Sequence, residues 1–120
     1  MILDIEKRTF NFSVLLLSSL RSVPQNLTTN VILNQLMRSG TSIGANVTEG
    51  RASASKRDFI NFHSHALKSA RETIYWLRLL QTVPTSEQNL QMYTPLIQEV
   101  MEISKIIGKI IVSCRKNMNV

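Results

Sequence analysis

The chain has 120 residues, of which 43% are hydrophobic, and it carries 4 glycines and 3 prolines. This length suits one domain with one core, so we expect residues 1–120 to form a single unit. The composition excludes a disordered tail, and no internal repeat indicates a repeat array. The formal net charge is +6 at pH 7, with a local excess of basic residues over 38–78, and such a balance favours nucleic acid or another acidic partner.

Features of secreted and membrane proteins are missing from the sequence. Cys114 is the single cysteine, so no internal disulfide can form and a reducing compartment is mildly favoured. Asp4 and Glu6 lie where a secretory signal would be basic, and charged residues interrupt the apolar region near the C-terminus. We therefore expect a cytoplasmic protein with no membrane partner.

Apolar residues recur at helical spacing in four segments, of which two lie in the first half of the chain. The first helix is expected over residues 4–22, because Pro24 disfavours its continuation. The second is expected to begin at a cap, either Thr28 or Thr29, and to reach Gly50.

The second half of the chain predicts two longer helices. Ser55 followed by Asp58 resembles a capping box and would start a third helix over residues 56–83. The order Thr94-Pro95, a cap followed by proline, predicts the start of the fourth helix. Its apolar seam alternates steps of four and three residues, as in a bundle core: Leu96, Val100, Ile103, Ile107, Ile110 and Cys114.

Nothing in the chain alternates as a strand does, so the fold class is all-α, an antiparallel up-down four-helix bundle. The first and fourth helices offer more apolar residues than one bundle contact requires. Either another subunit covers this surplus or the helix is central within its own bundle. The surplus residues are Val14, Leu15 and Leu17 in the first helix and Ile97, Met101, Ile106, Ile111 and Val112 in the fourth.

The stretch RSGTSIGANVTEG, residues 38–50, places two different faces on the second helix. Gly40 and Gly44 lie one turn apart and form a glycine notch, at a cost of about 1 kcal/mol each relative to alanine. If the following turn centres near residue 52, the notch lies beside Phe59 and Phe62 of the third helix. A packing notch is preferred here over a flexible hinge.

The opposite face of the same helix carries a polar row, Arg38, Ser42, Asn46 and Glu49. One interpretation is a solvated surface. The other is a defined polar contact at a subunit boundary, where the guanidinium and the carboxylate of two symmetry-related copies pair head to tail.

These residues, followed by SKRDFINFHSHALKSARETIYWLRLL at 55–80, resemble the four-helix-bundle family of the 23S ribosomal RNA intervening-sequence proteins. That family is similar in fold to the accessory variability determinant proteins of diversity-generating retroelements. The resemblance covers about residues 10–112, with Val47-Thr48 where members commonly have Ile-Ala. Its specific pattern is met at Arg38, Ser42, Ile43, Asn46, Glu49 and Gly50.

The resemblance implies an antiparallel bundle that assembles as a homopentameric ring, with a basic surface and no catalytic activity. It implies as partners further copies of the chain and, for the retroelement members, a reverse transcriptase with its template RNA. The charge of the chain favours RNA or DNA as a further partner, and no cofactor is expected.

The third helix carries the residues that favour RNA binding. A cationic row lies opposite the apolar face and can track phosphates, while its tyrosine can stack on an unpaired base. The alternative is a solvated face that only keeps the protein soluble. The cationic row consists of Lys56, Arg57, Lys68, Arg71, Tyr75 and Arg78.

The sequence contains no residue pattern typical of a catalytic or metal-binding site. His63 and His65 are two residues apart rather than four, and His63 is expected to be a packed core histidine rather than a ligand. We therefore predict no enzyme and no metal site. Two function classes remain: a nucleic-acid-binding adaptor, and a protein-interaction or structural ring whose charge is incidental.

Overall fold

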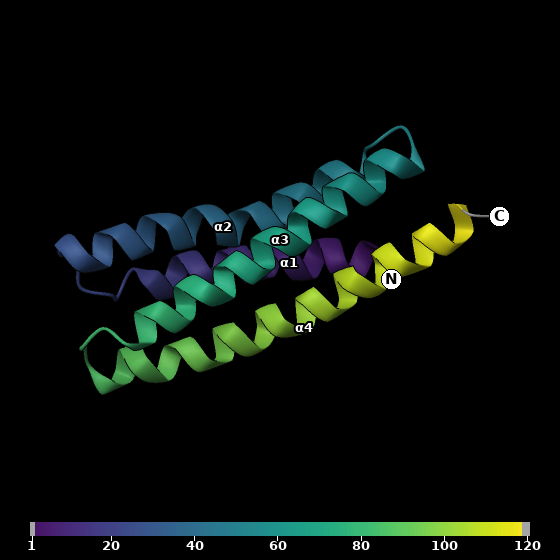
Figure 1. The fold of residues 1–120 in the computed structure, drawn as a ribbon. Helices are drawn as coiled ribbons and strands as arrows, with labels where there is room; N and C mark the ends of the chain where they lie inside the picture. Colours follow the sequence, from purple (N-terminus) through teal and green to yellow (C-terminus); the bar gives the residue numbers. More distant parts are fainter. Residues whose placement is uncertain (1, 119–120) are drawn as a thin grey trace.

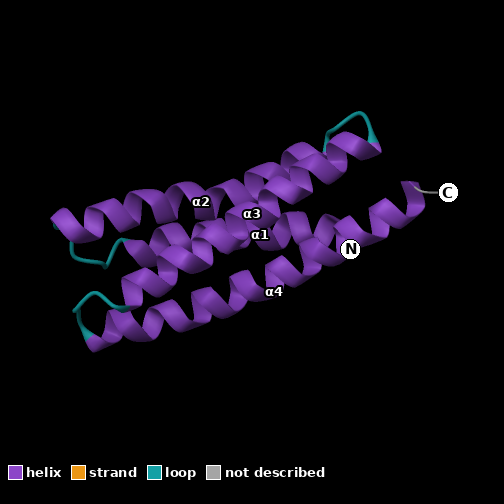
Figure 2. Ribbon diagram, in the orientation of Figure 1, coloured by secondary structure: helices purple, strands orange, loops and turns teal. Residues whose placement is uncertain are grey.

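The computed structural model describes residues 2–118 and contains four α-helices. They are α1 (Ile2–Leu20), α2 (Leu27–Arg51), α3 (Lys56–Gln81) and α4 (Glu87–Met118). No strand occurs within residues 2–118, and short loops join the helices (Figure 2). The prediction of an all-α chain with four helices is confirmed.

The helices form an elongated bundle, with extents of 53 × 20 × 20 Å. Each helix packs on two others, since α1 contacts α2 and α4, and α3 contacts the same two helices. The loop between α2 and α3 lies at one end of the molecule, and the other two loops lie at the opposite end (Figure 1). Both α1 and α3 therefore lie between α2 and α4 around one shared core.

The core contains the apolar rows that helical spacing predicts. In α1, Ile5, Phe12 and Leu16 are fully buried, and Leu20 is nearly so. In α4 the seam residues from Leu96 to Ile110 are buried, while Cys114 at its end is half-buried. Burial of such side chains stabilises the fold by roughly 1.5–3 kcal/mol each.

The start of α2 differs from the prediction, because Asn26 rather than Thr28 or Thr29 is the N-cap. The Asn26 side chain accepts a hydrogen bond from the Thr29 backbone N–H at 2.9 Å, and Thr29 Oγ1 accepts one from the Asn26 N–H at 2.9 Å. This reciprocal capping box satisfies two backbone donors at the helix start. Thr29 thus belongs to the first turn.

The start of α4 also differs, because the helix begins at Glu87 and Pro95 lies inside it. Two buried side chains, Asn89 and Tyr93, hold the earlier turns against the rest of the bundle. Asn89 Nδ2 donates to Thr85 Oγ1 at 3.1 Å, which ties the first turn to its loop. Tertiary packing here outweighs the cost of about 3 kcal/mol that proline imposes inside a helix.

The glycine notch of α2 is a packing notch, but its partner is α1 rather than α3. A Cβ at Gly40 would overlap Leu16 Cδ2, and a Cβ at Gly44 would lie 3.3 Å from the Thr9 backbone. The prediction that Phe59 and Phe62 enter the notch is therefore wrong. The prediction matched residues at equal distances from the α2–α3 turn, so it considered only α3 as a neighbour. In the bundle α2 also packs on α1.

The glycine that faces α3 is the last one in α2. A Cβ on Gly50 would lie 2.9 Å from His63 Nδ1 and 3.1 Å from Phe62 Cβ. Phe59 stacks on His63 with ring centroids 4.0 Å apart, and both phenylalanines are half-buried. The predicted burial of His63 is confirmed.

The surplus apolar residues of α1 and α4 differ in how far the bundle buries them. In α4, Ile97 and Ile111 are buried within the chain's own bundle, whereas Met101 and Val112 are exposed. In α1, all three surplus residues remain exposed: Val14, Leu15 and Leu17. The bundle itself thus accounts for part of the surplus on α4 and leaves that of α1 open to solvent.

Candidate nucleic-acid interface

The cationic row lies on the outer face of α3, and all six of its side chains are exposed. The helix begins at Ser55, whose Oγ accepts a hydrogen bond from the Asp58 backbone N–H at 3.1 Å. Its opposite face buries Ala66, Ala70 and Leu77 completely. Burial of this apolar face fixes which way the cations point, so the row faces solvent along about 33 Å of helix.

Four of the acidic side chains that the structure describes form ion pairs: Glu6, Glu72, Glu99 and Glu102. Arg8 binds Glu99 through two hydrogen bonds of 2.8 Å, and this interaction raises the pKa of the arginine. Arg51 pairs with Glu6 at 2.9 Å. Between the described side chains, no ion pair involves Lys68, Arg71 or the other members of the cationic row. Positive charge on this face is therefore available to a partner.

One acidic residue on α3, Glu72, lies close to the row in sequence. Arg38 of α2 pairs with it, and the Trp76 indole N–H donates to the same carboxylate at 2.9 Å. These two contacts hold the carboxylate toward α2 and offset its charge. Tyr75 remains 59% exposed and meets the Trp76 ring edge-on, with centroids 5.0 Å apart.

The middle of the cationic row borders a groove between α3 and α4. This α3–α4 groove has a volume of about 520 Å³ and combines cations with apolar side chains. Its lining residues are Ser64, Leu67, Lys68, Arg71, Gly108, Ile111, Val112 and Arg115. The fold thus places Arg115, from a helix that sequence reasoning had not assigned to the site, beside Lys68 and Arg71.

The outer members of the row lie apart from this groove. Arg57 is eleven residues from Lys68, which corresponds to about 17 Å along the helix. Arg78 lies toward the opposite end of α3. The structure therefore places the six predicted residues along one face, with two of them in the groove and four outside it.

The polar row of α2 makes contacts within its own subunit. Ser42 Oγ donates to the Arg38 carbonyl at 2.7 Å, and Asn46 Nδ2 donates to the Ser42 carbonyl at 2.9 Å. Arg38 is held by Glu72 of α3 and by Gln35, whose Oε1 accepts from its Nε at 3.1 Å. Ser42 and Asn46 are half-buried, while Glu49 is exposed.

Two buried polar side chains lie inside the bundle, away from the cationic row. His63 Nδ1 lies 2.9 Å from the Phe59 carbonyl, and burial lowers the pKa of the histidine below its ordinary value of 6.5. Burial raises the pKa of Tyr93. Within the described part of the chain, His63 Nε2 and Tyr93 Oη have no hydrogen-bond partner. Both are enclosed in the core rather than placed at a cleft, so neither indicates a catalytic site.

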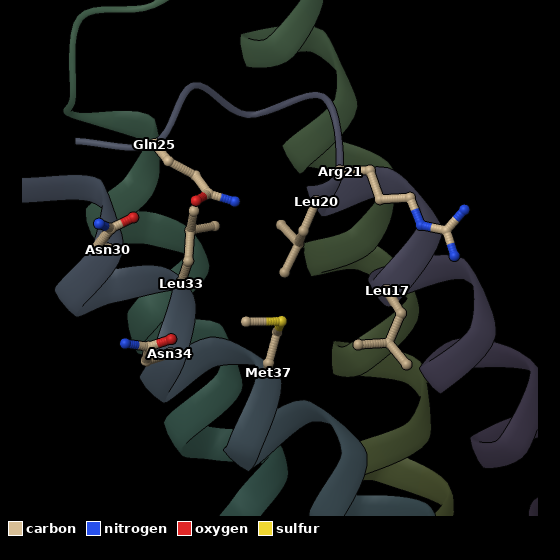
Figure 3. Close-up of a pocket in the computed structure, with 8 residues that line it drawn as sticks. All are labelled: Leu17, Leu20, Arg21, Gln25, Asn30, Leu33, Asn34 and Met37. Atoms are coloured by element: carbon tan, nitrogen blue, oxygen red, sulfur yellow. The ribbon is translucent and has the colours of Figure 1, made fainter.

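A second hollow of about 330 Å³ lies between α1 and α2 (Figure 3). Leu20, Leu33 and Met37 point into it, while the Arg21 guanidinium extends away from it. No group of three or more metal-ligating side chains occurs across the described residues. None of the helices in residues 2–118 is long and apolar enough to cross a membrane.

The geometry places the chain among the basic four-helix proteins, with an apolar core and a cationic outer face on α3. The pattern of the 23S rRNA-intervening sequence protein family matches residues 2–109. The chain therefore belongs to this family, as the motif of residues 38–50 predicted.

A solved structure supports the same assignment. It is that of a protein of unknown function from the S23 ribosomal protein family of Bacteroides thetaiotaomicron. The two sequences are 32% identical, and the match covers 89% of this chain and 97% of that chain with a TM-score of 0.75. No protein with curated annotation matches the chain.

Proposed function

We propose that the protein is a non-catalytic RNA-binding bundle that engages structured RNA through its cationic row. The observation that carries this proposal is the exposed face of α3. Five cations follow one helix there, and no carboxylate of the described side chains pairs with them. Phosphates spaced along a nucleic-acid strand provide the complementary charges.

The family description supports RNA rather than an acidic protein as the partner. It associates members with intervening sequences of 23S rRNA, an RNA context. The exposed Tyr75 within the row also suits RNA, because an aromatic ring can stack on an unpaired base. A reverse transcriptase partner, which the resemblance to the retroelement proteins implies, stays a prediction.

We further propose that the subunit is an antiparallel up-down bundle and that five copies form a ring. The chain exposes 7325 Å², whereas a compact monomer of its 13.6 kDa mass exposes about 6,600 Å². Exposed Val14, Leu15 and Leu17 supply apolar surface that a neighbouring copy would cover. A ring would repeat the cationic row around one assembly, so that weak contacts combine.

The test is a salt series of binding to a structured RNA, with the mass of the assembly measured by light scattering on the same sample. For five phosphate contacts to a single-stranded segment, the affinity should fall about 100-fold between 50 and 200 mM salt. A mass of five chains would support the ring. Absence of binding at 50 mM would favour the alternative, a protein-interaction ring without a nucleic-acid role.

The double variant Lys68→Glu/Arg71→Glu tests the site itself. Both side chains are exposed, so we expect the fold to persist and RNA binding to be lost. The matched control is Lys109→Glu/Lys116→Glu, which makes the same charge change at exposed positions of α4 outside the row. Equal losses in both variants would show a general charge effect and contradict the assignment to α3.

A further inference from the structure

Of the four glycines, Gly108 is the one whose lack of a side chain is not required by packing within the subunit. A Cβ added there would meet nothing within 4 Å, whereas the three glycines of α2 each face a close neighbour. Glycine inside a helix costs about 1 kcal/mol relative to alanine. In α4 the missing side chain leaves open the α3–α4 groove, of which Gly108 forms part of the wall.

The groove combines two kinds of surface. Leu67, Ile111 and Val112 contribute apolar area, and Val112 is 54% exposed although it lies against this hollow. Lys68, Arg71 and Arg115 surround that area with three positive charges, and none of the described residues that line the groove is acidic. An occupant that matches both surfaces carries negative charge beside a flat or apolar group.

The dimensions of the groove decide between two such occupants. It spans residues 64–71 on α3 and 108–115 on α4, so each wall is about 10 Å long. An acidic amphipathic helix needs several turns, each of about 5.4 Å, to present anchors to a groove. One or two nucleotides fit a length of 10 Å and a volume of 520 Å³, which lies in the range of small-ligand sites.

We infer that the α3–α4 groove binds an unpaired nucleotide of the RNA, an inference that rests on the proposed RNA-binding function. The phosphates contact Lys68, Arg71 and Arg115. The base lies on the apolar area formed by Leu67 and Val112, in the space that the absent side chain of Gly108 leaves. Paired RNA cannot offer a free base, so duplex binds through phosphate contacts with the cationic row and does not use the space beside Gly108.

The experiment compares two fluorescent RNAs at 50 mM salt by anisotropy, a single-stranded 12-mer and a blunt duplex of the same sequence. Gly108→Leu fills the groove and leaves every charge in place. It should weaken binding of the single strand at least tenfold and leave duplex binding within twofold. Gly108→Ala, which adds one methyl group, should produce a smaller loss in the same direction.

Ser113→Leu is the matched control, because it adds a leucine at an exposed α4 position outside the groove. It should bind both RNAs as the unaltered protein does. Circular dichroism and light scattering on every variant establish that helix content and assembly mass are unchanged.

The outcomes separate the two proposals. If the unaltered protein binds neither RNA, the proposed function fails and this inference fails with it. If it binds both and Gly108→Leu changes neither affinity, the groove inference is overturned while RNA binding stands. If Gly108→Leu changes the assembly mass, the groove is occupied by another copy of the chain, which also overturns the inference.

Discussion

The glycines of α2 and the glycine of α4 show two opposite uses of the same residue. Gly40 and Gly44 let α1 approach α2 so closely that Leu16 and the Thr9 backbone occupy the space of their side chains. Gly108 faces open space between α3 and α4. In α2, close packing of α1 inside the subunit offsets the lower helix propensity of glycine. In α4 no such packing exists, and the open α3–α4 groove is the feature that the glycine provides.

The largest expected difference in stability is between leucine substitutions at Gly40, which is packed, and at Gly108, which is open. Gly40→Leu should lower the free energy of unfolding by about 3 kcal/mol, because the new side chain overpacks a core that Leu16 already fills. Gly108→Leu should leave stability unchanged or raise it. Urea denaturation followed by circular dichroism measures both, and similar midpoints for the two variants would contradict the comparison.

Alanine gives a smaller and more selective effect. Gly108→Ala should raise the free energy of unfolding by about 1 kcal/mol, since helix propensity improves and no neighbour is touched. Gly44→Ala should gain less, because its Cβ would press on the Thr9 backbone at 3.3 Å. Thermal melts of the two variants test this. An equal increase in Tm for both variants would show that α1 shifts away from the added methyl group at little cost.

The smallest expected effect is a pH dependence of stability that arises from His63, which occupies the space beside Gly50. Its pKa is lowered by burial, so the unfolded chain takes up a proton near pH 6.5 while the native chain resists it to lower pH. Stability is therefore full above about pH 6.5 and declines as the pH falls below that value.

His63→Gln should remove this decline between about pH 7 and pH 5 in urea denaturation curves. His65→Gln on the exposed face of α3 is the control and should keep it. A decline of the same size in the His63 variant would assign the pH dependence to other groups.

Helical periodicity predicted the four helices and most of the core, because rows such as Ile5, Phe12 and Leu16 need only their own helix to be recognised. It failed at the start of α4, where a locally favourable cap-and-proline order competes with the buried side chains of Asn89 and Tyr93. Local sequence cannot weigh tertiary contacts such as that of the Asn89 side chain with Ser22, whose Oγ donates to Asn89 Oδ1 at 3.2 Å across 67 residues of chain.

The candidate site was predictable as a face but not as a groove. The spacing of Lys68 and Arg71 on one helix was enough to identify the exposed row. Arg115 joins them only through the packing of α4 on α3, which no periodicity within one helix reveals. The signal that sequence reasoning missed is Gly108, a poor helix former that lies beside the regular apolar seam of α4 rather than in it.

The bidentate contact of Arg8 with Glu99 joins the first helix to the last, across 91 residues of chain. During synthesis, α1 emerges from the ribosome long before α4, so this pair cannot form until most of the chain has been translated. The apolar face of α1 has only α2 to pack on during that interval. We expect the nascent protein to close its bundle late, after α4 becomes available, and premature termination before α4 should yield a chain prone to aggregation.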